Sequence, residues 1–191
     1  MTSTFELSLG ASSFCYYSLF WFDQEPKVML DLKTERLQFR QWSKNDVSSF
    51  TTFFSSEKDA RFVGGVKTPE EAWRLMATYI GHYELLGYSY LAIETIDSKQ
   101  LIGTVGLWNS HPWPEPELGY WLLPSAQGKG FGREAGTAVY DYARQMELPS
   151  LVSYIDPANE PSKKLALAIG AQLDGMVDLL DFGPHEVYRY W

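Results

Sequence analysis

The best candidate for a ligand-binding site is a short segment, residues 127–132, in which three glycines stand at alternate positions. The segment reads Gln127-Gly128-Lys129-Gly130-Phe131-Gly132. It follows an apolar run that ends at Pro124, and it opens a segment with the periodicity of a helix. Glycines leave backbone amides uncovered, and the first N–H groups of a helix have no partner within the helix. The segment therefore predicts a site for a phosphate or pyrophosphate group.

Three phosphate-binding motifs and a plain turn compete for this segment. A P-loop requires Ser or Thr after Gly-Lys, whereas Gly128-Lys129 is followed by Gly130. The dinucleotide fingerprint fits Gly130-x-Gly132-x-x-Ala135, with Asp156 as a ribose-binding acid, but that fingerprint normally opens its fold near the first strand. The third motif is Gln-x-x-Gly-x-Gly. Glycines between a strand and a helix can also serve only to permit a tight turn.

The composition is that of one globular domain. The chain has 191 residues, of which 45% are hydrophobic and 21% charged, so it can bury an ordinary core. The aromatic content of 16% indicates aromatic-lined surfaces or a well-filled core. A net charge of −8 argues against a nucleic-acid partner, because phosphate backbones are bound by clustered Lys and Arg. The same charge suits a cationic substrate.

The sequence gives no sign of secretion, membrane insertion or metal binding. Cys15 is the only cysteine, so no disulfide can form within the chain. No apolar run approaches the length of a membrane span, and residues 11–22 lack the features of a signal peptide. No Cys/His cluster has metal-ligand spacing. We therefore expect a cytoplasmic protein with no membrane partner and no metal. Residues 1–28 show no period and are read as an unassigned extension of a domain at residues 29–191.

The elements that must position the glycine segment can be predicted from periodicity and turn signals. A strand is expected at Leu37 and Phe39, and Ser43 is expected to cap a first helix. Thr-Pro-Glu-Glu at residues 68–71 is a helix start, and Gly87 ends that helix. Further strands are expected at residues 88–96, 101–108, 117–123, 151–155, 175–180 and 187–191, and further helices at residues 130–146 and 159–169.

The resulting order is β-α-α-β-β-β-α-β-α-β-β. Three consecutive strands without a helix argue against a doubly wound sheet, in which strands and helices alternate. This order therefore counts against the dinucleotide interpretation. A mixed sheet with helices on both faces fits it better.

The glycine segment and the order of elements together resemble the GNAT N-acetyltransferases, and most closely the branch that includes the ribosomal-protein N-terminal acetyltransferases. The resemblance covers about residues 30–191. The fold it implies is a mixed α/β (α+β) fold with a mostly antiparallel sheet of six to seven strands, helices on both faces and a splay between two parallel central strands. The matching pieces are Thr34-Glu35-Arg36-Leu37, Leu101-Ile102-Gly103-x-Val105-Gly106, Glu117-Leu118-Gly119-Tyr120-Trp121-Leu122-Leu123-Pro124, Gln127-x-x-Gly130-x-Gly132, Asn159-x-x-Ser162 and Ala168-Ile169-Gly170.

The resemblance implies that acetyl-CoA, as cosubstrate, gives its acetyl group to a primary amine by direct attack in a ternary complex. Residues 127–132 would hold the pyrophosphate. The amides at Leu122 and Leu123 would bind the pantetheine arm and polarise the thioester carbonyl, and Asn159 and Ser162 would also contact the cosubstrate. The acceptor can be a protein N-terminus or a small amine, and a homodimer is one option for the assembly. The alternative is a non-catalytic acetyl-CoA sensor or scaffold, because Ala166 stands where many relatives have Tyr.

Attack on the thioester requires a neutral amine, whereas an alkyl ammonium has a pKa near 10, so a general base is expected. Glu117 is the first candidate, because it begins the strand that leads to the acetyl group. Glu115 and His111 are nearby alternatives that could also contact the acceptor. Ser162 is the hydroxyl available to the departing thiolate, and it could equally cap a helix beside Asn159. Side chains that could line the acceptor cleft, or only anchor loops, are Trp108, Trp113 and Phe62.

Overall fold

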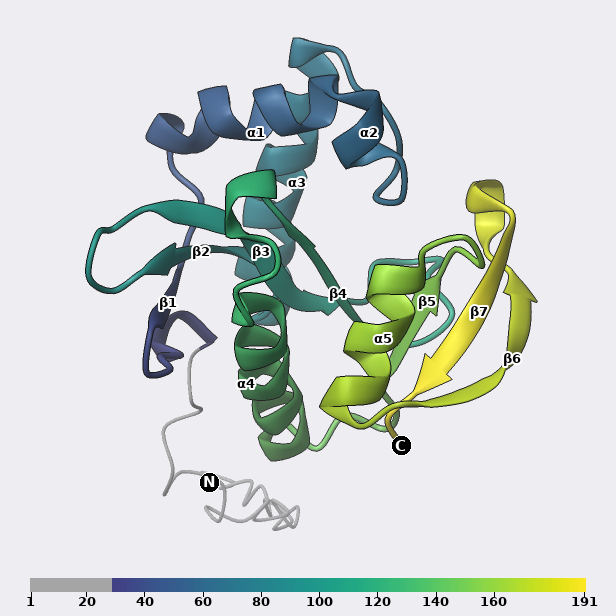
Figure 1. Cartoon of the computed structure of the whole chain (residues 1–191). Helices are drawn as coiled ribbons and strands as arrows, with labels where there is room; N and C mark the ends of the chain where they lie inside the picture. The colour runs from purple at the N-terminus through teal and green to yellow at the C-terminus, as the bar shows by residue number, and fades with distance from the viewer. Residues whose placement is uncertain (1–28) are drawn as a thin grey trace, which may run out of the picture.

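The centre of the molecule is a seven-stranded sheet with the strand order β1-β2-β3-β4-β5-β7-β6 (Figure 1). The structure is a computed structural model that describes residues 29–191, so the N-terminal segment 1–28 and Cys15 lie outside the described residues. Neighbouring strands are antiparallel except β4 and β5, which are parallel. This arrangement confirms the mixed sheet that the sequence predicts. The strands are β1 (Leu37–Arg40), β2 (Tyr90–Thr95), β3 (Leu101–Trp108), β4 (Glu117–Leu122), β5 (Val152–Ile155), β6 (Gln172–Asp178) and β7 (Pro184–Arg189).

The helices begin and end near the predicted signals. Thr68 caps α3 with its side-chain oxygen, Glu71 bonds back to the Thr68 amide, and Gly87 ends the helix at a φ of 76°. The short helix α2 was not predicted, and the last two strands begin a few residues earlier than expected. The helices are α1 (Val47–Ser55), α2 (Glu57–Ala60), α3 (Pro69–Leu86), α4 (Phe131–Gln145) and α5 (Glu160–Ile169).

Two hydrophobic clusters cover the two faces of the sheet. On one face, α1 and α3 pack an aromatic cluster that includes Phe50 and Tyr79 against Trp121 of β4. On the other face, Val139 and other small residues of α4 pack against Leu118 of β4. Because successive side chains of a strand point to opposite faces, alternate residues of β4 serve the two clusters. Strand β4 therefore presents side chains to both sides of the sheet.

The parallel strands β4 and β5 separate soon after they meet. Their register aligns Glu117 with Val152 and no later pair among the described residues, and the Val152 amide donates to the Pro116 carbonyl over 3.0 Å. One step further along, the Ser153 hydroxyl rather than a backbone amide donates to the carbonyl of Leu118. A side chain thus bridges the point at which the gap opens. The expected splay between two parallel central strands is confirmed.

The backbone groups of β4 that face the gap follow from the alternation of a strand. The carbonyls of Pro116 and Leu118 face β5, so the N–H groups of Tyr120 and Leu122 face the same edge. The register of β4 and β5 pairs neither Tyr120 nor Leu122 with a residue of β5. The Leu123 amide, in contrast, donates to the Ile102 carbonyl of β3 over 2.9 Å. The expectation that the Leu123 amide is free is therefore wrong, because Leu123 lies on the β3 edge of the strand.

Candidate functional site

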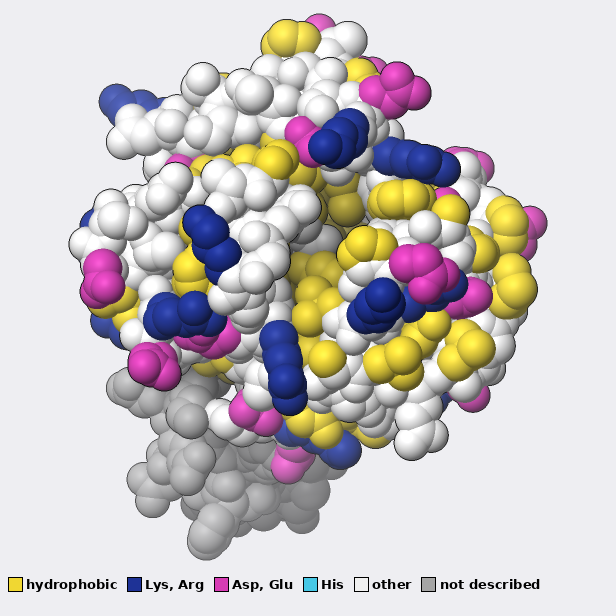
Figure 2. Space-filling model, viewed as in Figure 1, with side chains coloured by type: hydrophobic (Ala, Val, Ile, Leu, Met, Phe, Trp, Pro, Cys, Tyr) yellow, Lys and Arg dark blue, Asp and Glu magenta, His cyan; other side chains and the backbone are white. Residues whose placement is uncertain are grey.

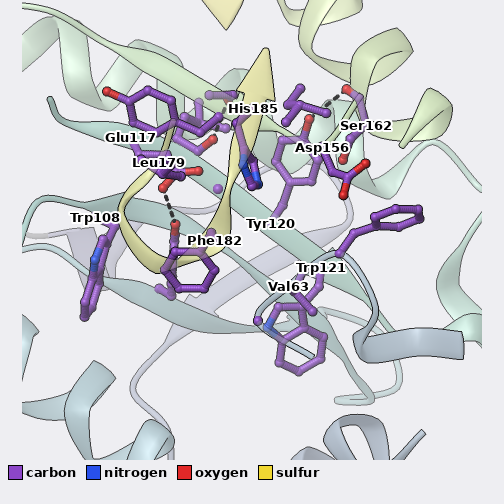
Figure 3. Close-up of a pocket in the computed structure, with 18 of the residues that line it drawn as sticks. Val63, Trp108, Glu117, Tyr120, Trp121, Asp156, Ser162, Leu179, Phe182 and His185 are labelled. Atoms are coloured by element: carbon purple, nitrogen blue, oxygen red, sulfur yellow. Dashed lines mark hydrogen bonds between the residues drawn. The ribbon is translucent and has the colours of Figure 1, made fainter. Parts of the chain in front are cut away.

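A cavity of about 310 Å³ lies where β4 and β5 separate (Figure 3). Its walls come from β4, β5, the start of α5, the loop after α2 and the turn between β6 and β7. In Figure 2 the molecule is hollowed near the centre of this face, and hydrophobic side chains line the hollow. The cavity brings together several residues that the sequence singles out, namely Phe62, Trp108, Trp113, Glu117, Asp156, Asn159 and Ser162.

Glu117 is the buried acid of this cavity. It is the first residue of β4 and is only 8% exposed. Burial raises the pKa of its carboxyl group to about 7, because the charged form loses its hydration. The Tyr154 amide and the Trp113 indole N–H oppose this rise, although the indole N–H stays outside hydrogen-bond geometry. The carboxyl group can therefore take up or release a proton near neutral pH.

The Tyr90 hydroxyl donates a hydrogen bond to the Glu117 carboxylate over 3.3 Å. Gly119 makes this contact sterically feasible, because a Cβ at that position would lie 2.2 Å from the Tyr90 oxygen. Tyr90 was not among the site residues predicted from the sequence. The glycine inside the Glu117-Leu118-Gly119 motif was the only local signal that another group approaches the strand closely.

A stack of rings fixes Tyr90 in place. Its ring stacks on Trp108 at a centroid distance of 5.5 Å, and Trp108 stacks on the imidazole of His82 at 4.1 Å. The Nδ1 atom of His82 lies 2.8 Å from the Tyr88 carbonyl, and Nε2 accepts from the Asn109 amide over 3.3 Å. Nδ1 therefore carries the hydrogen. Burial lowers the pKa of His82, so the ring is neutral and acts as a flat packing surface.

The two alternatives to Glu117 lie outside the cavity. The carboxylate of Glu115 forms two hydrogen bonds with the guanidinium of Arg189, at 2.8 and 2.9 Å. These bonds lower the pKa of Glu115 to about 2, so the group is a poor proton acceptor at neutral pH. His111 is exposed in the turn between β3 and β4 and does not line the cavity.

Ser162 lines the cavity from the first turn of α5. The helix cap is Asn159, whose side-chain oxygen accepts from the Ser162 amide over 3.3 Å. The capping side chain is thus that of Asn159, so the interpretation of Ser162 as a capping residue is wrong. The carbonyl of Ser162 accepts from the Tyr120 hydroxyl over 2.9 Å. In Figure 3, Glu117 and Ser162 lie on opposite sides of the cavity with Tyr120 between them.

The glycine segment forms an open turn before α4. Gly128 and Gly130 have φ values of 72° and 83°, which residues with a side chain rarely adopt. Within the described chain, the backbone amides of residues 128–132 have no hydrogen-bond partner. They lie at the positive end of α4, which begins at Phe131. Uncovered amides at a helix N-terminus fit a pyrophosphate group.

Side chains from both sides support this turn. The Gln127 side-chain amide donates to the Leu122 carbonyl over 2.9 Å, which ties the turn to the end of β4. Arg36 donates to the Lys129 carbonyl over 3.2 Å, and its guanidinium lies 4.5 Å from the centre of the Phe131 ring. Arg36 also pairs with Glu134 at 2.6 Å. This role of Arg36 was not predicted, since nothing local in the sequence connects Arg36 with the turn.

Two further properties concern metals and membranes. Over residues 29–191, no three His, Cys, Asp or Glu side chains come together in a way that could hold a metal ion. No helix in that range is long and apolar enough to cross a membrane.

Comparisons with known proteins agree with this geometry. Residues 36–172 match the family model for the acetyltransferase (GNAT) domain. The uncharacterized N-acetyltransferase YoaA of Bacillus subtilis (strain 168) is 29% identical over 152 residues, which is 76% of this chain and 85% of YoaA. A crystal structure of an acetyltransferase from Agrobacterium tumefaciens (strain C58) has a TM-score of 0.77 and 32% identity, over 84% of this chain and 93% of that chain.

The fold is also that of the ribosomal L7/L12 α-N-protein acetyltransferase RimL, whose structure contains coenzyme A. That structure has a TM-score of 0.67 and 19% identity, over 82% of this chain and 94% of the RimL chain. The likeness to RimL concerns the fold alone. The family model, which spans most of the chain, and the Agrobacterium structure carry the assignment. This chain therefore belongs to the GNAT acetyltransferase family and is an acetyl-CoA-dependent acyltransferase.

Proposed function

We propose that this enzyme acetylates a primary amine by direct attack in a ternary complex, with Glu117 as the general base. The observation that carries the proposal is the buried Glu117 carboxyl group, whose pKa of about 7 suits proton transfer at neutral pH. An amine arrives as an ammonium ion with a pKa near 10 and must lose a proton before it can attack. Glu117 is the buried acid that lines the cavity at the splay, whereas Glu115 is held by Arg189.

The backbone supplies the binding site for acetyl-CoA, which brings the activated acetyl group. The amides of residues 128–132 hold the pyrophosphate. The N–H groups of Tyr120 and Leu122 face the gap between β4 and β5, where they bind the pantetheine arm and polarise the thioester carbonyl. Asn159 and Ser162 flank the same gap from α5.

The amine and the acetyl thioester then meet in the gap between β4 and β5. The amine nitrogen attacks the acetyl carbon, a C–N bond forms and the C–S bond breaks. The Glu117 carboxylate accepts the proton that the nitrogen loses. The Ser162 hydroxyl, on the other side of the cavity, gives its proton to the departing thiolate and is re-protonated through solvent by the second proton that the nitrogen releases. Burial raises the pKa of Tyr120 above its ordinary value, so its phenol stays protonated and keeps its bond to the Ser162 carbonyl.

Initial-rate kinetics and mass spectrometry test the ternary complex. Thiol release from acetyl-CoA should depend on an amine, and double-reciprocal plots at several amine concentrations should intersect. The enzyme should gain no acetyl group when it is incubated with acetyl-CoA alone. Parallel plots together with an acetylated enzyme would replace direct attack by a covalent pathway. Binding of acetyl-CoA without thiol release for any amine would contradict amine acetylation itself.

A further inference from the structure

We infer that the acceptor is a small primary amine carried by a flat apolar body of about the size of an aromatic ring. This inference rests on the proposed function, because it names the substrate class of the same site. Three observations carry it: the rings that form the walls on the Glu117 side, the few charges in the lining, and the limited space.

Aromatic rings form most of the wall around Glu117. Tyr79 meets the faces of Tyr90 and Trp108 edge-on, at centroid distances of 5.2 and 5.8 Å. Elsewhere in the lining, Trp113 and Phe182 meet edge-on at 5.8 Å. Rings prefer other rings at such distances, and the burial of a flat apolar body adds hydrophobic free energy. A ring on the acceptor would thus continue an arrangement that the walls already have.

The charges of the lining suit one ammonium group. Glu117 and Asp156 are the two carboxylates that line the cavity, and Lys67 is a cation at the same wall, bonded to the Gly64 carbonyl over 2.8 Å. An ammonium ion beside Glu117 would also be attracted by the faces of the surrounding rings. A polyamine or an aminoglycoside would bring further charges or hydroxyls against mostly apolar walls, where few groups replace their lost hydration.

The space and its cover favour a small molecule. The cavity of about 310 Å³ must also hold the acetyl end of the cosubstrate. A Cβ on Gly64 would lie 4.0 Å from the Phe182 ring, so the loop after α2 and the turn between β6 and β7 approach each other at the cavity. A protein N-terminus continues into a chain whose backbone N–H and C=O groups need partners. Walls made mostly of aromatic and aliphatic side chains supply few such partners.

An acceptor panel with matched amines tests the inference on the wild-type enzyme with acetyl-CoA. The panel holds 2-phenylethylamine, ethylamine, spermidine, kanamycin and a short peptide with a free N-terminus, and the measured quantity is kcat/KM from thiol release. We expect 2-phenylethylamine to exceed each of the others by roughly tenfold or more. A higher value for spermidine, kanamycin or the peptide would overturn the inference and leave amine acetylation intact. Release with none of them, while calorimetry shows acetyl-CoA binding, would overturn the proposed function as well.

A pair of exposed side chains provides the matched variants. Phe182 lines the cavity and is 52% exposed, whereas Leu173 on β6 is 57% exposed and does not line it. Phe182→Ala should lower kcat/KM for 2-phenylethylamine severalfold more than for ethylamine, and Leu173→Ala should leave the ratio of the two amines unchanged. Thermal unfolding of both variants checks that they fold. An unchanged ratio in a folded Phe182→Ala variant would overturn the assignment of the aromatic wall to the acceptor.

Discussion

The cosubstrate turn and the acceptor cavity are built from different groups. The segment of residues 127–132 offers backbone amides, and side chains matter there chiefly by their absence at Gly128 and Gly130. The acceptor end is built from side chains that come from separate strands, such as Glu117 and Tyr90. A backbone site should be damaged by adding atoms, and a side-chain site by removing them. Four substitutions test this difference.

The largest effect is expected from Glu117→Gln, which keeps the shape of the side chain and removes the base. We expect kcat/KM at neutral pH to fall by roughly 10²-fold or more, with partial recovery at high pH where more of the amine is already neutral. The pH–rate profile of thiol release measures this. Glu115→Gln is the control, because that carboxyl group is held by Arg189 outside the cavity. An equal loss in both variants would remove the distinction between the two acids.

The backbone site should respond to added atoms. Gly130→Val should weaken acetyl-CoA binding by more than tenfold, or about 1.4 kcal/mol, because a branched side chain covers the amides. Calorimetry measures the affinity. Gly87→Val is the matched control, since Gly87 has a φ of 76° against 83° at Gly130 and lies at the end of α3. Equal affinities in two folded variants would mean that the segment is only a turn.

Tyr90→Phe should shift the pH profile. The hydrogen bond from the Tyr90 hydroxyl stabilises the ionised form of Glu117 and so lowers its pKa. Without this bond the pKa should rise by roughly half a unit to one unit, and the acidic limb of kcat/KM should move to higher pH by the same amount. Below that limb the variant should be a few-fold slower, and above it nearly normal. A limb that stays in place would show that the contact does not tune Glu117.

The smallest effect is expected at the start of α5, where two neighbouring residues divide two roles. Ser162→Ala should lower kcat severalfold and leave the melting temperature nearly constant, because Asn159 provides the cap. Asn159→Ala should instead lose about 1 kcal/mol of stability. Both kcat and thermal unfolding are measured on each variant. A normal kcat in Ser162→Ala would leave protonation of the departing thiolate to solvent.

The backbone site could be predicted from sequence because its determinants are local. The glycines of residues 128–132 and the helix that follows them are adjacent in the chain, so their geometry follows from a few residues. The element order likewise follows from periodicity and from signals such as the cap at Thr68. The contacts that distant residues make with this segment could not be predicted from the sequence. Arg36 donates to the carbonyl of Lys129 although β1 to β4 lie between them in the sequence.

The limit of prediction from sequence is clearer at the side-chain site around Glu117. Glu115 and Glu117 are separated by one residue, and both were candidates for the base. Their environments differ because Glu115 pairs with Arg189 of β7, whereas the Glu117 side chain lines a mostly apolar cavity beside Tyr90. No local pattern distinguishes the two carboxylates, since the distinction depends on which distant side chain each one meets. The stack of His82, Trp108 and Tyr90 is likewise assembled only when α3, β2 and β3 pack together.

The buried Glu117 also sets how the stability of the fold depends on pH. Its pKa rises from an ordinary value of 4.5 to about 7 on folding, so the folded chain holds this proton more tightly than the unfolded chain does. By linkage, the contribution of this group to stability is greatest below about pH 4.5, decreases as the pH rises through 7, and then levels off. The ionised form that accepts the proton of the amine is thus the form that weakens the fold. Glu117→Gln should therefore melt higher than the wild type in alkaline buffer, and activity and stability oppose each other at a single carboxyl group.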